Sequence, residues 1–138
     1  MPEGSIGYRV LVEAPFDCLY GYNINLGNEI VVHGNCFMQD AANISIGNRV
    51  IIGPDVKFYC LDIAVEAGKR SKTSHVVHAG AIKVEEDAYI GGNSVILPYR
   101  TIGKGAVVGA GSVVTRVSAP PCPLISTKIA KQKNLEVG

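Results

Sequence analysis

The side chains best suited to acid–base chemistry in this sequence are its three histidines, His33, His75 and His78. An imidazole exchanges a proton near neutral pH, so it can act as a general base on a hydroxyl group. His33 lies within a regular repeat, whereas His75 and His78 lie in a segment that interrupts it. A rigid framework would therefore hold His33, and we expect it to be the proton acceptor, with Asp40 as its orienting carboxylate.

The cysteines give no pattern of metal or redox chemistry. Cys18, Cys36, Cys60 and Cys122 lie far apart in the sequence, and none forms a C-x-x-C pair. A zinc knuckle or a dithiol redox motif would need such a pair. Free thiols in a reducing compartment are the simplest interpretation, which predicts a cytoplasmic protein.

The framework that must position these residues is a repeat of six residues. Every sixth residue from Val84 to Val114 is a β-branched aliphatic: Val84, Ile90, Ile96, Ile102, Val108 and Val114. A helix would repeat its apolar residues every three or four positions, and an amphipathic strand every two. Six residues are what a short strand and a tight corner consume, and three such units close a coil of about 18 residues. The sequence therefore predicts an all-β, parallel β-helix.

The repeat continues toward the N-terminus with one change of phase. One early run is Leu26, Val32 and Met38, and a second is Ile46, Ile52 and Phe58. The two runs are out of phase by two residues, which predicts a bulged corner between them. Glycine, asparagine and aspartate tolerate the backbone of such corners, so the 16 glycines need no phosphate-binding loop to explain them.

Three segments interrupt the repeat within what we expect to be a single domain over residues 1–138. Residues 1–20 form a lead-in with one strand over residues 8–13. Residues 60–80 form an inserted loop, and a loop of that length is usually functional or disordered. Prolines at positions 120, 121 and 123 end the solenoid, and residues 117–138 form a C-terminal cap with a short helix over residues 127–135.

Composition excludes several functional classes. The formal net charge is +1, which argues against nucleic acid or an anionic membrane as a partner because both select a clustered basic surface. Charged residues make up 18% and hydrophobic residues 47%, so the chain is not of the disordered class. No apolar run is long enough to span a membrane, and the N-terminus has no basic segment followed by an apolar one, so no signal peptide is expected.

At residues 13–118 the sequence resembles the hexapeptide-repeat acetyltransferases, and most closely the maltose and galactoside O-acetyltransferases. The resemblance rests on the entry segment 15–24, on Asn35-Cys36 with Asp40, and on a series of corner motifs: Ile46-Gly47-Asn48, Ile52-Gly53-Pro54, Ile90-Gly91-Gly92, Ile96-Leu97-Pro98 and 108–115. It implies a left-handed β-helix and a homotrimer, with acetyl-CoA bound in a groove between two subunits. It also implies a histidine in the inserted loop that acts as a general base, so that the acceptor hydroxyl attacks the thioester directly.

Within this resemblance the sequence departs from the family at the active site. The family's loop histidine corresponds to Ile63, its orienting asparagine to His33, and a loop tyrosine to His78. We therefore predict His33 and Asp40 as the catalytic pair. The predicted substrate-binding residues are Asn35, Tyr59, Ile63 and His78. The predicted acetyl-CoA-binding residues are Gly91, Gly92, Ala110, Gly111, Thr115 and Arg116, with Lys104 and Lys128 as further candidates for the coenzyme's phosphates.

The leading functional prediction is a CoA-dependent O-acyltransferase acting on a small acceptor. Leu61, Ile63 and Val65 stand where a sugar enzyme would present polar groups, so we expect an acceptor more apolar than a sugar. One alternative is a repurposed hexapeptide-fold protein that binds or transforms an apolar small molecule without acetyl-CoA. Another is a metal-dependent lyase, because the related γ-class carbonic anhydrases hold zinc with three histidines. Their spacing differs from His75-x-x-His78, so no metal is expected.

Overall fold

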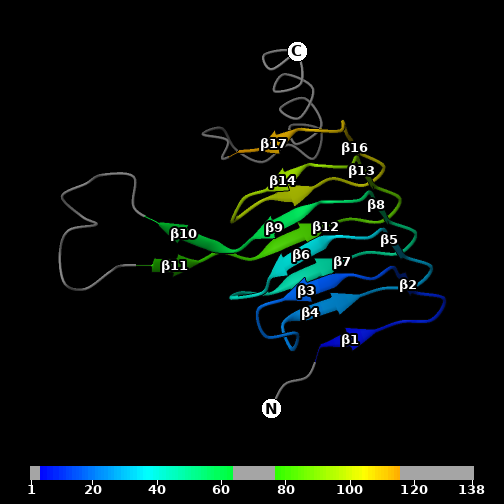
Figure 1. The fold of residues 1–138 in the computed structure, drawn as a ribbon, viewed down its shortest axis with the longest axis horizontal. Helices are drawn as coiled ribbons and strands as arrows, with labels where there is room; N and C mark the ends of the chain where they lie inside the picture. Colours follow the sequence, from blue (N-terminus) through cyan, green and yellow to red (C-terminus); the bar gives the residue numbers. More distant parts are fainter. Residues whose placement is uncertain (1–3, 64–76, 116–138) are drawn as a thin grey trace.

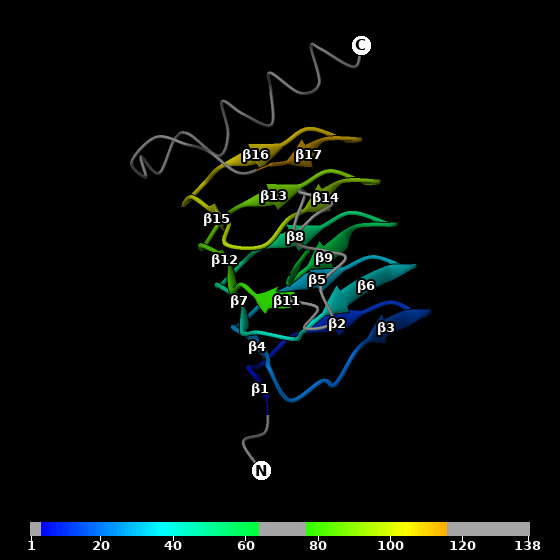
Figure 2. The ribbon, with the colours of Figure 1, turned by 90° about the vertical axis from the view of Figure 1, so that its left-hand side faces the viewer.

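The computed structural model describes residues 4–63 and 77–115, which form a left-handed parallel β-helix (Figure 1). Three sheets of five strands each make up its sides. In every coil the chain passes through sheet A, then sheet B, then sheet C. The coils stack from β1, next to the N-terminus, to β15, β16 and β17 at the other end (Figure 2). The predicted fold is thus confirmed.

The strands are short, as a six-residue unit requires, and all of their pairings within the three sheets are parallel. Sheet A contains β1 (Ser5–Ile6), β4 (Ile24–Leu26), β7 (Ile44–Ile46), β12 (Ile82–Val84) and β15 (Thr101–Ile102). Sheet B contains β2 (Leu11–Val12), β5 (Val31–Val32), β8 (Ile51–Ile52), β13 (Tyr89–Ile90) and β16 (Val107–Val108). Sheet C contains β3 (Phe16–Cys18), β6 (Cys36–Gln39), β9 (Lys57–Tyr59), β14 (Val95–Ile96) and β17 (Val113–Val114).

The core is the stack of aliphatic residues that the six-residue period predicts. In sheet B, for example, Val32, Ile52, Ile90 and Val108 are fully buried and are paired in register from coil to coil. Phe58 is the largest fully buried side chain and continues the equivalent ladder in sheet C. Burial of apolar surface at about 25 cal/mol per Å² makes these ladders the main source of stability.

The corners between sheets A and B carry alternating charges. Arg9, Glu29, Arg49 and Asp87 occupy equivalent corner positions in successive coils, with φ angles of 55–61°. Arg49 Nε donates to Asp87 Oδ1 at 2.8 Å, and this hydrogen bond lowers the pKa of Asp87 below its usual value. Side chains of opposite charge thus follow one another along this corner, where the sequence alone suggested only glycine, asparagine and aspartate.

The N-terminal half differs from the sequence prediction in one feature and confirms it in another. The lead-in contains a complete first coil, because β1 and β3 accompany the predicted strand, which is β2. The bulged corner is confirmed, since Met38 and Ile46 are eight positions apart rather than six and both point into the core. The first coil has the same longer step, from Cys18 to Leu26.

The inserted segment leaves the corner between sheets C and A as a two-stranded antiparallel ribbon. Its strands, β10 (Leu61–Ile63) and β11 (Val77–Ala79), project from the stack of coils (Figure 1). Residues 64–76, with His75, lie outside the described residues, as does the predicted C-terminal cap over residues 117–138. In the part of the chain that the structure describes, no helix is long and apolar enough to cross a membrane.

Candidate functional site

His33 lies at the corner between sheets B and C, directly after β5. Its backbone N–H donates to the carbonyl of Ile52 in the next coil at 2.9 Å, so the residue is held between coils. Its side chain is 41% exposed, and its Nδ1 lies 3.1 Å from Oε1 of Glu13 in the preceding coil. The imidazole is therefore both accessible to a ligand and oriented by a carboxylate, as a general base requires.

Asn35 lies at the same corner, two residues further along the chain. Its backbone has a left-handed conformation, with φ of 62°, and its N–H donates to the carbonyl of Pro15 at 2.8 Å. The Asn35 carbonyl accepts a hydrogen bond from Lys57 Nζ at 2.9 Å. Because the side chain of Asn35 is exposed, its amide is available to a ligand beside His33.

The residues predicted to hold acetyl-CoA lie further along this corner. We call the corner the B–C edge; it comprises residues 13–15, 33–35, 53–56, 91–94 and 109–112 of the five coils. Gly91 and Gly92 lie on it in the fourth coil, and Ala110 and Gly111 in the fifth. Thr115 follows β17 at the other end of sheet C, and Arg116 lies outside the described residues. The structure thus places His33 and Asn35 in line with four of the six predicted coenzyme residues.

Close stacking of the backbone explains why glycine is found at Gly91. A Cβ atom there would lie 2.5 Å from the backbone nitrogen of Ala110 in the next coil, and one at Gly53 would lie 2.6 Å from that of Gly92. These distances are too short for a side chain. The glycines therefore allow successive coils to stack closely along this edge.

We expect Gly91→Ala to lower the free energy of unfolding by about 1–3 kcal/mol, because an added methyl group must push two coils apart. Urea denaturation of the purified protein measures this difference. Gly105→Ala is the matched control: it has no atom within 4 Å of its added Cβ and bears only the strain of its positive φ, about 1 kcal/mol. Equal stability of Gly91→Ala and the parent would contradict this packing argument.

Asp40 does not orient His33, and that prediction is wrong. Asp40 lies past the far end of β6, and the four residues of that strand separate the two positions by about 13 Å. Its carboxylate is fully buried and accepts hydrogen bonds from three backbone N–H groups, those of Tyr20 at 2.8 Å, Gly21 at 2.7 Å and Asn23 at 3.1 Å. Asp40 therefore stabilises the bulged corner, and sequence reasoning missed Glu13 as the carboxylate beside His33.

Tyr59, Ile63 and His78 lie at or beyond the end of the sheet C strands that is far from His33. Tyr59 ends β9, where its ring packs against Phe37 with centroids 6.1 Å apart. Ile63 ends β10, and the exposed His78 on β11 pairs in register with Asp62. One chain therefore does not bring these three residues to His33 and Asn35. A site that used both groups would need two copies of the chain.

The three cysteines that the structure describes, Cys18, Cys36 and Cys60, are unsuited to nucleophilic catalysis. Burial raises the pKa of the Cys36 and Cys60 thiols, so both stay protonated at neutral pH. Burial also raises the pKa of Cys18, and the charges of Asp40 and Asp17 add to the effect. All three thiols are free. Among the described residues no three histidine, cysteine or acidic side chains form a cluster that could hold a metal ion.

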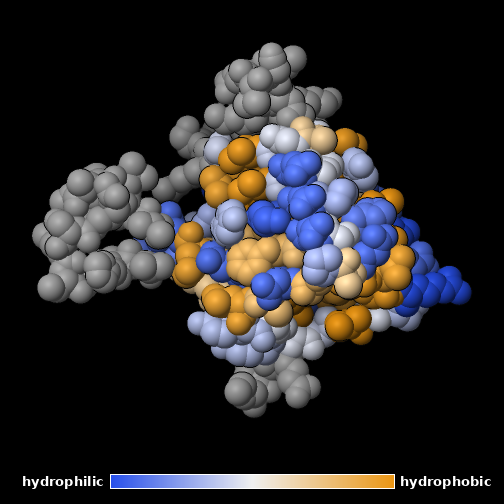
Figure 3. Space-filling view, viewed as in Figure 1, coloured by the Kyte–Doolittle hydropathy of each residue, from blue (hydrophilic) through white to orange (hydrophobic). Residues whose placement is uncertain are grey.

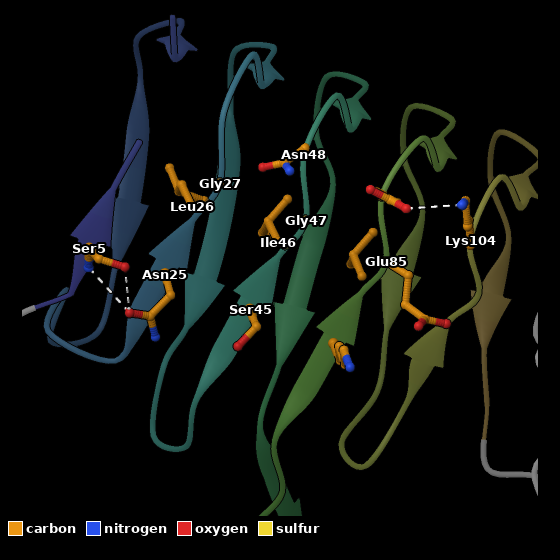
Figure 4. A pocket seen from close by; sticks show the side chains of 13 residues that line it. Ser5, Asn25, Leu26, Gly27, Ser45, Ile46, Gly47, Asn48, Glu85 and Lys104 are labelled. Atoms are coloured by element: carbon orange, nitrogen blue, oxygen red, sulfur yellow. Dashed lines mark hydrogen bonds and ion pairs between the residues drawn. The ribbon is translucent and has the colours of Figure 1, made fainter. Parts of the chain in front are cut away.

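Two further hollows escaped the sequence prediction. A shallow groove of ≈ 460 Å³ crosses sheet A, where Asn25 accepts hydrogen bonds from Ser5 and where Lys104 pairs with Glu86 at 3.0 Å (Figure 4). Lys104, a candidate for the coenzyme's phosphates, thus forms an ion pair within the chain. An apolar cavity of ≈ 320 Å³ opens at the N-terminal end of the solenoid between Ile6, Val12 and Phe16. On the face seen in Figure 3, hydrophobic side chains are interspersed with hydrophilic ones.

Comparison with known proteins agrees with this fold. Residues 81–116 match the family model for the bacterial transferase hexapeptide, which has six repeats. The chain is similar to a hexapeptide-repeat-containing acetyltransferase from Vibrio cholerae, with 36% identity over 83% of this chain and 64% of that one and a TM-score of 0.76. A second structure of that protein contains acetyl-CoA and has a TM-score of 0.77.

A maltose O-acetyltransferase from Clostridium difficile 630 is also similar, with 35% identity over 84% of this chain and 61% of that one and a TM-score of 0.76. Curated relatives with acetyltransferase names include one from Schizosaccharomyces pombe, which is 33% identical over 87% of this chain. The alignment spans 56% of that relative and 61% of a second one from Staphylococcus aureus. The chain therefore spans about three fifths of the curated relatives that it matches.

Proposed function

Because the chain belongs to the hexapeptide-repeat acetyltransferase family, we propose that it is a CoA-dependent O-acyltransferase whose reaction takes place at the B–C edge. One observation carries this proposal: the half-exposed imidazole of His33 and the exposed Asn35 lie in line with the glycine-containing corners of the fourth and fifth coils. The acetyl-CoA complex of the Vibrio cholerae relative supports acetyl-CoA as the donor.

The proposed reaction is a direct transfer between acetyl-CoA and a hydroxyl group. Nε2 of His33 removes the hydroxyl proton while the oxygen attacks the thioester carbonyl. The carbon–sulfur bond then breaks, and the coenzyme leaves as a thiolate that takes the proton from the imidazolium. The product is an acetyl ester, and no atom of the enzyme is acylated. The protonated state of the buried cysteines supports direct attack over a thioester intermediate on the protein.

We propose that the acceptor is a small molecule more apolar than a sugar. The ring contact between Phe37 and Tyr59 gives this part of sheet C an apolar surface next to the base of the ribbon, where Leu61 is half-buried. Hydroxyl-rich ligands need polar partners, because each unpaired buried polar group costs about 1–3 kcal/mol. An Ile63→Asp variant that kept the parent's KM for the acceptor would count against an apolar site at the ribbon.

The proposed assembly is a homotrimer that associates through sheet B and forms its sites between subunits. Leu11, Val31, Ile51, Tyr89 and Val107 point outward from sheet B and stack in register. Four of them are 41–56% exposed, which leaves an apolar stripe along the whole sheet. The equivalent outward residues of sheet A are polar or charged: Ser5, Asn25, Ser45, Lys83 and Thr101. Contiguous exposed apolar residues commonly mark interfaces, and this stripe adjoins the B–C edge.

Light scattering at micromolar concentration should then give three times the chain mass of 14.6 kDa. Ile51→Lys with Val107→Lys should shift the protein to monomer, because each lysine would place a charge in an apolar interface. Ser45→Lys on sheet A is the matched control and should leave the mass unchanged. A monomeric parent protein would contradict the trimer.

Calorimetric titration with acetyl-CoA, followed by an assay for free CoA thiol in the presence of acceptor alcohols, tests the function as a whole. We expect binding and acceptor-dependent thiol release. Absence of both would favour the second candidate, a protein that binds an apolar small molecule without acetyl-CoA. The apolar cavity at the end of the solenoid and Ile63 at the family's histidine position favour that alternative. We further propose a cytoplasmic location, since the three described thiols are free.

A further inference from the structure

Glu13 and His33 occupy the same position of the repeat in two successive coils. Each directly follows a strand of sheet B, and each donates its backbone N–H to the next coil: Glu13 to Val32 at 2.8 Å and His33 to Ile52 at 2.9 Å. In the next three coils this position is glycine, at Gly53, Gly91 and Gly109. The side chains of Glu13 and His33 therefore project from backbone positions that hydrogen bonds between coils hold in place. The next coil has glycine at this position, so Gly53 has no side chain that could cover the imidazole.

The contact between the two side chains determines which ring nitrogen of His33 is free. Glu13 Oε1 lies 3.1 Å from Nδ1 of His33. An ionised carboxylate can only accept a hydrogen bond, so Nδ1 must carry a proton in this contact. Among the described residues no group bonds the other ring nitrogen, Nε2. A neutral imidazole held in this way leaves the lone pair of Nε2 free to accept a proton.

We infer that Glu13 is a positioning residue for acyl transfer, which fixes His33 in the Nδ1–H tautomer and so makes Nε2 the proton acceptor. This inference rests on the proposed function, in which His33 is the base. When Nε2 takes the hydroxyl proton, the imidazolium is stabilised by the carboxylate already bonded to Nδ1, and the proton then passes to the departing thiolate. The other charged side chains on the neighbouring elements are Asp17 on β3, Asp55 at the next corner and Lys57 on β9.

Nitrogen-15 NMR of the histidine rings at a pH where His33 is neutral tests the pair without any assay of activity. The parent protein should show His33 mainly with the proton on Nδ1. Glu13→Ala should shift it toward the Nε2–H form that neutral imidazole prefers in water. Glu13→Gln should give a mixture of the two tautomers, because its amide oxygen can accept from Nδ1–H and its amide nitrogen can donate to an unprotonated Nδ1. Glu29→Ala is the control, since this exposed carboxylate of the A–B corner pairs with Arg9.

Kinetics of the same variants test the positioning role. Glu13→Ala should lower kcat by about 10–100-fold with little change in KM for acetyl-CoA, as is typical when a partner that orients a catalytic group is lost. Glu13→Gln should recover part of that loss, and Glu29→Ala should match the parent.

An unchanged tautomer in Glu13→Ala would overturn the pair, and a switched tautomer with the parent's kcat would overturn its role in catalysis. Both results leave the proposed function standing as long as His33→Ala is inactive. Parent-level turnover by His33→Ala would instead refute the proposed base, whatever the tautomer shows. The two failures are thus distinguishable.

Discussion

Replacement of His33 by alanine is expected to slow acetyl transfer by about 10²–10⁴-fold, the usual contribution of a general base. The imidazole is the only one on the regular coils, is half-exposed, and is oriented by Glu13. Loss of the base should lower kcat and kcat/KM together, because proton removal occurs in the transition state and not in substrate binding. Stopped assays of CoA thiol release at saturating acetyl-CoA measure this change.

The matched control for this variant is Lys83→Ala, which removes an exposed side chain from sheet A. Its rate and its mass by light scattering should both equal those of the parent. His33→Ala should also keep the parent's circular dichroism spectrum, since the side chain contributes nothing to the buried ladders. A folded His33→Ala protein that turned over at the parent rate would show that the base lies elsewhere.

Replacement of Asp40 by alanine is expected to lower the free energy of unfolding by about 3 kcal/mol or more. The buried carboxylate satisfies the partly buried backbone N–H groups of Tyr20, Gly21 and Asn23, and each of them left without a partner costs about 1 kcal/mol or more. Urea denaturation of the purified variant measures the loss through its midpoint.

Asp17→Ala provides a comparison, because within residues 4–63 and 77–115 the exposed Asp17 carboxylate accepts only from the neighbouring N–H of Cys18. It should change stability by no more than about 0.5 kcal/mol. The stability of Asp40→Asn should lie between those of Asp40→Ala and Asp17→Ala, since one amide oxygen replaces the two carboxylate oxygens as acceptors. If Asp40→Ala instead kept its stability and lost only activity, Asp40 would be a catalytic residue and not a structural one.

The sequence was sufficient to predict the fold because a solenoid is built from local repeats. A β-branched residue at every sixth position can be buried only if the strands between the corners stack in register, so the ladder from Val84 to Val114 determined the architecture before any contact was known. The two-residue change of phase between Met38 and Ile46 likewise predicted the bulged corner. The first coil was harder to predict because its apolar residues form no long periodic run. Some of its inward residues are exposed, with Ile6 at 71%, whereas Phe16 and Cys18 are partly buried.

The candidate site could be predicted only in part, because its partners are neighbours between coils and not along the chain. The sequence by itself indicated His33 as the one histidine on the regular repeat, and its resemblance to the O-acetyltransferases added Asn35 and the glycines of the last two coils as candidates. The tertiary structure decided which carboxylate meets His33. Glu13 is twenty positions away but stands one coil below it, whereas Asp40 is nearer in sequence and lies beyond the length of β6. Coils of 18 or 20 residues place such distant positions in contact. Asp40 is held at its own corner by hydrogen bonds from the backbone.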